Sequence, residues 1–126
     1  MKGMYPCCLE TAEAVREAFD PEAARRRMGV GRADFARIFE HIWREVVDRR
    51  SLLDTAWRAG DDKAVALHAH TLKTSAATIG AEALRRAAEA LEQAAATGDR
   101  AAMDRAMRDF HAARDLLGRL VGIAVA

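Results

Sequence analysis

Apolar residues recur every three or four positions through most of this chain, which is the spacing of helices that bury one face. The pattern predicts two short helices and then four long ones, over residues 9–19, 21–29, 32–59, 62–79, 81–97 and 100–121. Connections of two or three residues favour antiparallel neighbours. We therefore expect an all-α protein, an antiparallel up-down-up-down four-helix bundle with a short additional N-terminal helical segment.

Glycine, proline and short acidic side chains mark the expected helix boundaries. Asp20, Pro21 and Glu22 are typical of an N-cap, a first-turn proline and an acid that complements the helix dipole. Gly29 is typical of a helix end, and the Gly-Asp pairs at 60–61 and 98–99 end one helix and cap the next. We expect a bundle over residues 18–122 and an extension over residues 1–17. That extension is either a partner-specific segment or a disordered tail.

Charge and composition exclude several classes of partner. The chain has 20 basic and 19 acidic residues, so its net charge of +1 creates no general attraction to nucleic acid or to an anionic membrane. Three consecutive arginines at positions 25–27 are interpreted as a solvated helix face. No apolar run is long enough to cross a bilayer. Cys7 and Cys8 make no disulfide framework and follow no secretory signal, which favours a reducing cytoplasm.

The segment HTLKTSAATIGA, residues 70–81, has a histidine that lies outside the buried face of its expected helix. At about 100° per residue, His70 points roughly 140° away from the centre of that stripe. We therefore expect an exposed imidazole, with Lys73 and Thr74 beside it one turn further on. The buried stripe itself consists of Val65, Ala69, Leu72, Ala76 and Ile79.

An exposed imidazole beside a lysine suits phosphoryl transfer. A solvent-facing histidine is largely neutral and nucleophilic at physiological pH. Phosphoryl transfer requires positioning and charge neutralisation, and Lys73 supplies a cation for the incoming phosphate. The small residues Ala66 and Ala77 leave room for a second protein. Leu67, one turn before His70, adds an exposed apolar side chain, as expected of a docking surface.

Metal chemistry has little support in the pattern. His68 lies two residues before His70 and so faces another side of the helix, whereas two ligands need a spacing of four. A carboxylate-bridged metal bundle would need Glu-x-x-His pairs at core positions, and none occurs there. We expect neither a bound metal nor a cofactor.

The pattern His-x-Leu-Lys-x-Ser-Ala-x-x-Ile-Gly-Ala resembles the phosphohistidine signature of histidine-containing phosphotransfer (HPt) domains. The resemblance extends over residues 19–120. It implies a four-helix bundle that relays phosphoryl groups between receiver domains of response regulators and hybrid kinases. It also implies that His70 is phosphorylated and that Lys73 stabilises the phosphate. Outside the signature, the resemblance includes Phe19, Asp20, Pro21, Glu22, Phe35, Phe39, Leu91 and Glu92.

Thr74 departs from that signature, which usually has glycine there. Its hydroxyl either bonds to His70 or the arriving phosphate, or its bulk narrows the choice of partner. The threonine also makes residues 70–74 slightly similar to the phosphoacceptor box of dimeric sensor kinases. That box usually has an acid after the histidine and a proline after the threonine, where this chain has Thr71 and Ser75. No Gly-rich ATP-binding region follows, so we expect no autonomous kinase activity.

Two functions follow as hypotheses. The first is a phosphorelay intermediate that accepts a phosphoryl group on His70 from a receiver-domain aspartate and passes it to another receiver. The magnesium for that step would belong to the receiver. The second is an adaptor or inhibitor that binds a receiver domain or sensor kinase without carrying phosphate. In either case we expect a cytoplasmic monomer whose partners are proteins.

Overall fold

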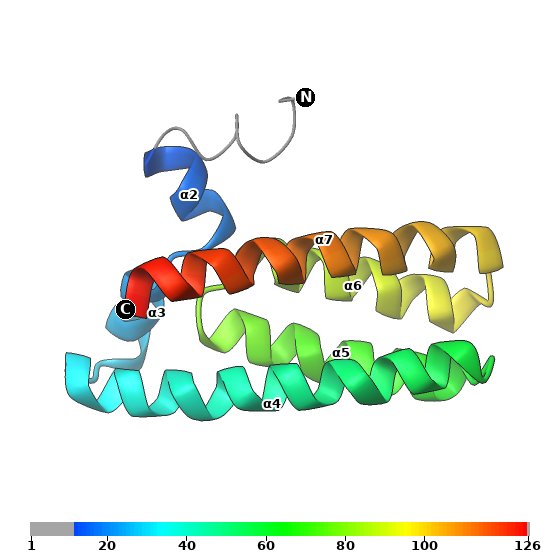
Figure 1. The fold of residues 1–126 in the computed structure, drawn as a ribbon, viewed down its shortest axis with the longest axis horizontal. Helices are drawn as coiled ribbons and strands as arrows, with labels where there is room; N and C mark the ends of the chain where they lie inside the picture. The colour runs from blue at the N-terminus through cyan, green and yellow to red at the C-terminus, as the bar shows by residue number, and fades with distance from the viewer. Residues whose placement is uncertain (1–11, 126) are drawn as a thin grey trace.

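The computed structural model describes residues 12–125, and this part of the chain consists of helices joined by short turns (Figure 1). The expected all-α class is confirmed. Each expected helix is present within these residues, the last extending further than expected, while positions 9–11 of the first lie outside the described residues. The bounds are α2 (Ala12–Ala18), α3 (Pro21–Met28), α4 (Arg32–Arg58), α5 (Asp62–Thr78), α6 (Glu82–Thr97) and α7 (Arg100–Val125).

The four long helices lie along one another as a bundle. Helix α5 packs against α4 and α6, and α6 packs against α7. The ribbon reverses direction at each of the three connections between them (Figure 1). Helix α2 contacts α6, and α3 lies at the end of the bundle where α4 begins and α7 ends. The central position of α5 leaves one of its faces open to solvent between its two neighbours.

Short acidic side chains begin three of the helices, as the sequence predicts. Asp20, Asp61 and Asp99 each accept a hydrogen bond from the backbone N–H three residues later, at 3.0, 3.1 and 3.1 Å. Such caps satisfy backbone donors that have no partner within the helix. Gly29 ends α3 in the left-handed conformation, with φ +72°. The turn chemistry therefore sets the ends of the helices and the short connections between them.

The core changes character from one helix to the next. Helix α4 contributes large side chains, among them the buried Phe35, Phe39, Val46 and Leu53. The seam between α5, α6 and α7 contains many small ones, because alanine at a contact position lets two helix backbones approach closely. The buried alanines of these three helices and their connection are Ala69, Ala76, Ala81, Ala87, Ala88, Ala94, Ala95, Ala106 and Ala113.

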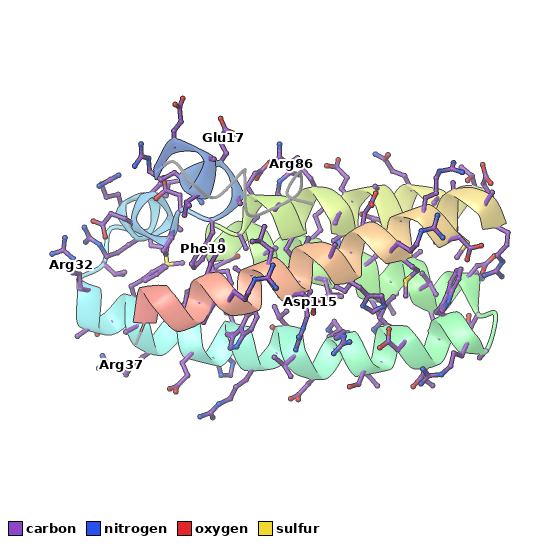
Figure 2. All side chains as sticks on the ribbon, turned by 45° about the horizontal axis from the view of Figure 1, so that its top comes forward. Glu17, Phe19, Arg32, Arg37, Arg86 and Asp115 are labelled. Carbon is purple, nitrogen blue, oxygen red and sulfur yellow. The ribbon has the colours of Figure 1, made fainter. Side chains whose placement is uncertain are left out.

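Helix α3 is fastened to the turn between α5 and α6. The Asp20 N–H donates to the Gly80 carbonyl at 2.8 Å. Gly80 has φ +79°, and a Cβ atom there would lie 2.3 Å from the Asp20 carbonyl oxygen, so only glycine fits. Phe19 is buried beside Phe39, with ring centroids 5.8 Å apart. In Figure 2, Phe19 lies against the bundle whereas Glu17 is directed outward.

The arginines at positions 25–27 are only in part the solvated face that the sequence suggests. Arg26 and Arg27 are exposed, but Arg25 is half-buried. Its guanidinium pairs with Glu22, one turn earlier, and donates to the Val30 carbonyl at 2.8 Å. Arg25 therefore ties the end of α3 to the connection that leads into α4.

Candidate functional site

His70 lies midway along α5 on the face that points away from the core. Its side chain is 57% exposed, as the helical spacing predicts. The stripe on the opposite face is fully buried, which fixes the rotation of α5 about its axis. The imidazole therefore lies where a second protein can reach it without opening the bundle.

Glu92 on α6 connects His70 to Lys73. One carboxylate oxygen lies 2.9 Å from His70 Nδ1, and the other lies 2.8 Å from Lys73 Nζ. The hydrogen bond from Lys73 is the largest cause of a lowered pKa of Glu92, the bond from His70 adds to it, and burial acts against it. The ionised carboxylate of Glu92 thus links two side chains of α5, His70 and Lys73, which lie one turn apart.

The ionised Glu92 decides which ring nitrogen is free. A carboxylate can only accept hydrogen bonds, so the Nδ1 atom of His70 must carry the hydrogen that it shares with Glu92. In the neutral ring, Nε2 then has the lone pair. A single contact therefore orients the ring and leaves the other nitrogen as a nucleophile.

Lys73, which the resemblance implies to be the residue that stabilises the phosphate, already has an anionic partner in this structure. Its side chain is 27% exposed, and its ammonium is held by Glu92. The local charges of Lys73 and Glu92 cancel in this state. An incoming phosphate would have to attract the lysine away from Glu92 or share it.

The expected docking residues do not all lie on the open surface. Leu67 is 61% exposed, and Thr74 and Ala77 are exposed as well. Ala66 is half-buried and packs against the core, so it contributes an edge of the surface at most. The Thr74 hydroxyl donates to the His70 carbonyl at 3.3 Å, which is a bond to the backbone of the histidine and leaves its ring free.

Helix α3 reaches the end of this surface. Arg27 donates a hydrogen bond to the Ala77 carbonyl at 3.2 Å. That carbonyl is in the last turn of α5, where it also accepts a hydrogen bond from the Gly80 N–H at 3.3 Å. An arginine outside the phosphohistidine signature therefore borders the face on which His70 lies.

Two of the other histidines, His68 and His111, have partners within the bundle. His68 faces α4, where Arg49 donates to its Nδ1 atom at 3.1 Å. Burial is the main cause of its lowered pKa, and the charge of Arg49 adds to it. His111 Nε2 lies 3.3 Å from Asp54. In the described part of the chain, no group of three or more His, Cys, Asp or Glu side chains is placed to hold a metal ion.

Glu92 is the functional residue whose role the sequence does not reveal. It lies 22 positions after His70 on another helix, so neither helical spacing nor a local motif joins the two. One usable signal is that Glu92 lies at the half-buried edge of α6, because a partly buried carboxylate needs a hydrogen-bond or ion-pair partner on the neighbouring helix. The sequence resemblance includes Glu92 but assigns it no contact.

One comparison with known proteins, a scan against family models, agrees with the geometry. A family model described as Hpt domain matches residues 37–122, which is more than half of the chain. The chain belongs to the Hpt domain family, and so to a family of phosphotransfer in two-component signalling. Receivers of response regulators and kinases are the partners of such domains. A search of curated proteins and a search of solved structures each find no match. Within residues 12–125, no helix combines the length and apolar character needed to cross a bilayer.

Proposed function

We propose that this protein is a phosphorelay intermediate, in which His70 accepts a phosphoryl group from an aspartate of one receiver domain and passes it to another. We also infer that the four long helices form an up-down-up-down bundle and that this bundle presents His70 at its surface. The observation that carries the proposal is the hydrogen bond between Glu92 and His70 Nδ1. It supports Nε2 as the attacking atom, because it leaves the free lone pair there.

Lys73 has the second role in this proposal. The phosphoryl group brings negative charge to the ring, and the lysine exchanges part of its contact with Glu92 for a contact with that charge. Because Glu92 holds the ammonium within reach before the partner arrives, little reorganisation is needed. The partner itself would bind over Leu67, Thr74 and Ala77, with Ala66 at the edge.

Transfer from charged receivers tests the proposal. Receiver domains phosphorylated with radiolabelled acetyl phosphate are mixed with the wild type, with His70→Gln and with His41→Gln. His41 is an exposed histidine on α4, so its replacement removes an imidazole from another part of the surface. We expect acid-labile label on the wild type and on His41→Gln, and none above background on His70→Gln.

Label that persists on His70→Gln would refute the assignment of the phosphoacceptor. Calorimetry with the same receivers distinguishes the adaptor hypothesis. If the wild type binds a charged receiver but takes no phosphate from it, the protein is an adaptor and not a carrier. Circular dichroism of each variant verifies that the helical content is unchanged.

A further inference from the structure

We propose that Glu92 keeps the Nδ1 hydrogen on the His70 ring after the phosphoryl group has bound to Nε2, so that the ring departs as a neutral imidazole when the group moves on. This inference rests on the proposed function and adds a role in the return step. Glu92 would be a positioning residue, since it acts on the phosphoryl group only through the ring.

The placement of Glu92 carries the inference. Its two oxygens are engaged separately, one by His70 Nδ1 at 2.9 Å and one by Lys73 Nζ at 2.8 Å. The carboxylate is 26% exposed and belongs to α6, which packs along α5. When Lys73 turns toward a phosphoryl group, the oxygen at Nδ1 can stay where it is. The hydrogen bond between Glu92 and His70 Nδ1 therefore persists after phosphorylation.

No other charged group competes for the Nδ1 position in the described structure. From α5, Lys73 is the charged side chain at this site, and from α6 it is Glu92. Glu89, nearly one turn earlier on α6, is bound by Arg85 at 2.9 Å. Helix α4 directs Glu45 and Arg49 to Ser75 and His68, on another side of α5.

The forward step balances without any movement of a proton. The Nε2 lone pair attacks phosphorus, the N–P bond forms, and the P–O bond to the receiver's aspartyl group breaks, which releases that carboxylate with the electron pair. The ring now carries both the phosphoryl group and the Nδ1 hydrogen, so it is a cation. Glu92 stabilises this cation as a carboxylate beside an imidazolium does in other enzymes.

The return step then depends on the same hydrogen. With Nδ1 protonated, a carboxylate oxygen of the next receiver's aspartate attacks phosphorus and forms a P–O bond, while the N–P bond breaks, returns its electron pair to Nε2 and yields neutral imidazole. If Nδ1 had lost its proton to water, the leaving group would be an imidazolate anion, which departs far less readily. Glu92 therefore extends the pH range in which the phosphorylated protein is a competent donor.

A measurement on the isolated protein tests this role. Phosphoramidate, a small P–N phosphoryl donor, phosphorylates the wild type, Glu92→Gln and the control Glu89→Gln. Glu89 is another glutamate of α6 and bonds to Arg85 and not to His70. The rate of hydrolysis of phospho-His70 is followed by phosphate-affinity gels between about pH 5 and about pH 9, and 15N spectra report the protonation of Nδ1.

In Glu92→Gln we expect the pH midpoint at which hydrolysis slows to fall by about one unit, which makes hydrolysis about tenfold slower on the alkaline side. Glu89→Gln should follow the wild-type profile. A merely structural role of Glu92 would change the stability in urea and leave the pH midpoint in place.

Coincident profiles for the wild type and Glu92→Gln would overturn the inference while leaving His70 as the phosphoacceptor. Failure of the proposed function has a different signature, because then the wild type acquires no label on His70, or His70→Gln acquires as much as the wild type. Glu92→Gln preserves the size of the side chain, and its far-UV spectrum verifies its fold.

Discussion

Replacing Gly80 by alanine tests whether the turn between α5 and α6 holds α3 in place. The added Cβ atom would lie 2.3 Å from the Asp20 carbonyl oxygen and 2.8 Å from its carbon. These are backbone atoms, so the contact cannot be relieved by rotating a side chain. The loop must move, and the 2.8 Å hydrogen bond between Asp20 and Gly80 is lost with it.

The magnitude follows from three contributions to the free energy of unfolding. The left-handed backbone at φ +79° costs alanine about 1 kcal/mol. The lost hydrogen bond contributes about 1 kcal/mol, and the displacement of Asp20 by the extra methyl group adds at least about 1 kcal/mol. We therefore expect Gly80→Ala to lower stability by about 3 kcal/mol.

Gly98→Ala is the matched control. Gly98 ends α6 with φ +72°, and a Cβ atom there would meet nothing within 4 Å. Only the backbone contribution remains, so the expected loss is about 1 kcal/mol.

Urea unfolding followed by circular dichroism measures the difference between the two variants. A gap of about 2 kcal/mol separates their midpoints by about 1 M urea at a typical slope. Equal midpoints for Gly80→Ala and Gly98→Ala would refute the reasoning, since the close approach of Asp20 would then contribute nothing.

Two further predictions concern the core and a buried histidine. Leu53→Ala, at a fully buried position of α4, should lower the free energy of unfolding by about 3 kcal/mol, whereas the neighbouring Leu52→Ala, at a 51% exposed position, should change it by less than about 0.5 kcal/mol in the same urea assay. The lowered pKa of His68 means that the folded state favours the neutral ring, so the wild type should lose stability relative to His68→Asn as the pH falls below the ordinary value of 6.5. Proton NMR should find the titration midpoint of His68 below 6.5, and a midpoint at or above that value would contradict the role given to burial and Arg49.

Local patterns predict much of this fold because its boundaries are local. The caps at Asp20, Asp61 and Asp99 depend on one side chain and the backbone three residues later, so a short window of sequence contains both partners. The exposure of His70 follows in the same way from the rotation of α5, which the buried stripe determines.

The contacts between side chains at the site could not be predicted in this way. The contact of Glu92 with His70 and Lys73 depends on the rotation and the offset of α6 relative to α5, and these follow from packing and not from spacing within either helix. For the same reason, the sequence does not reveal that the Lys73 ammonium is paired with Glu92. It also placed Ala66 on the docking face, although packing against neighbouring helices half-buries this residue.

The small side chains between α5 and α6 restrict how sequences of this kind can diverge. Ala69, Ala76 and Ala88 have no exposed surface, so a larger residue at any of them would force the two backbones apart. That separation would lengthen the distance between the Glu92 carboxylate and the His70 imidazole. Under the proposed function, selection for a working donor would act on the volume of residues that never touch phosphate, and it would disfavour side chains larger than a methyl group at these positions.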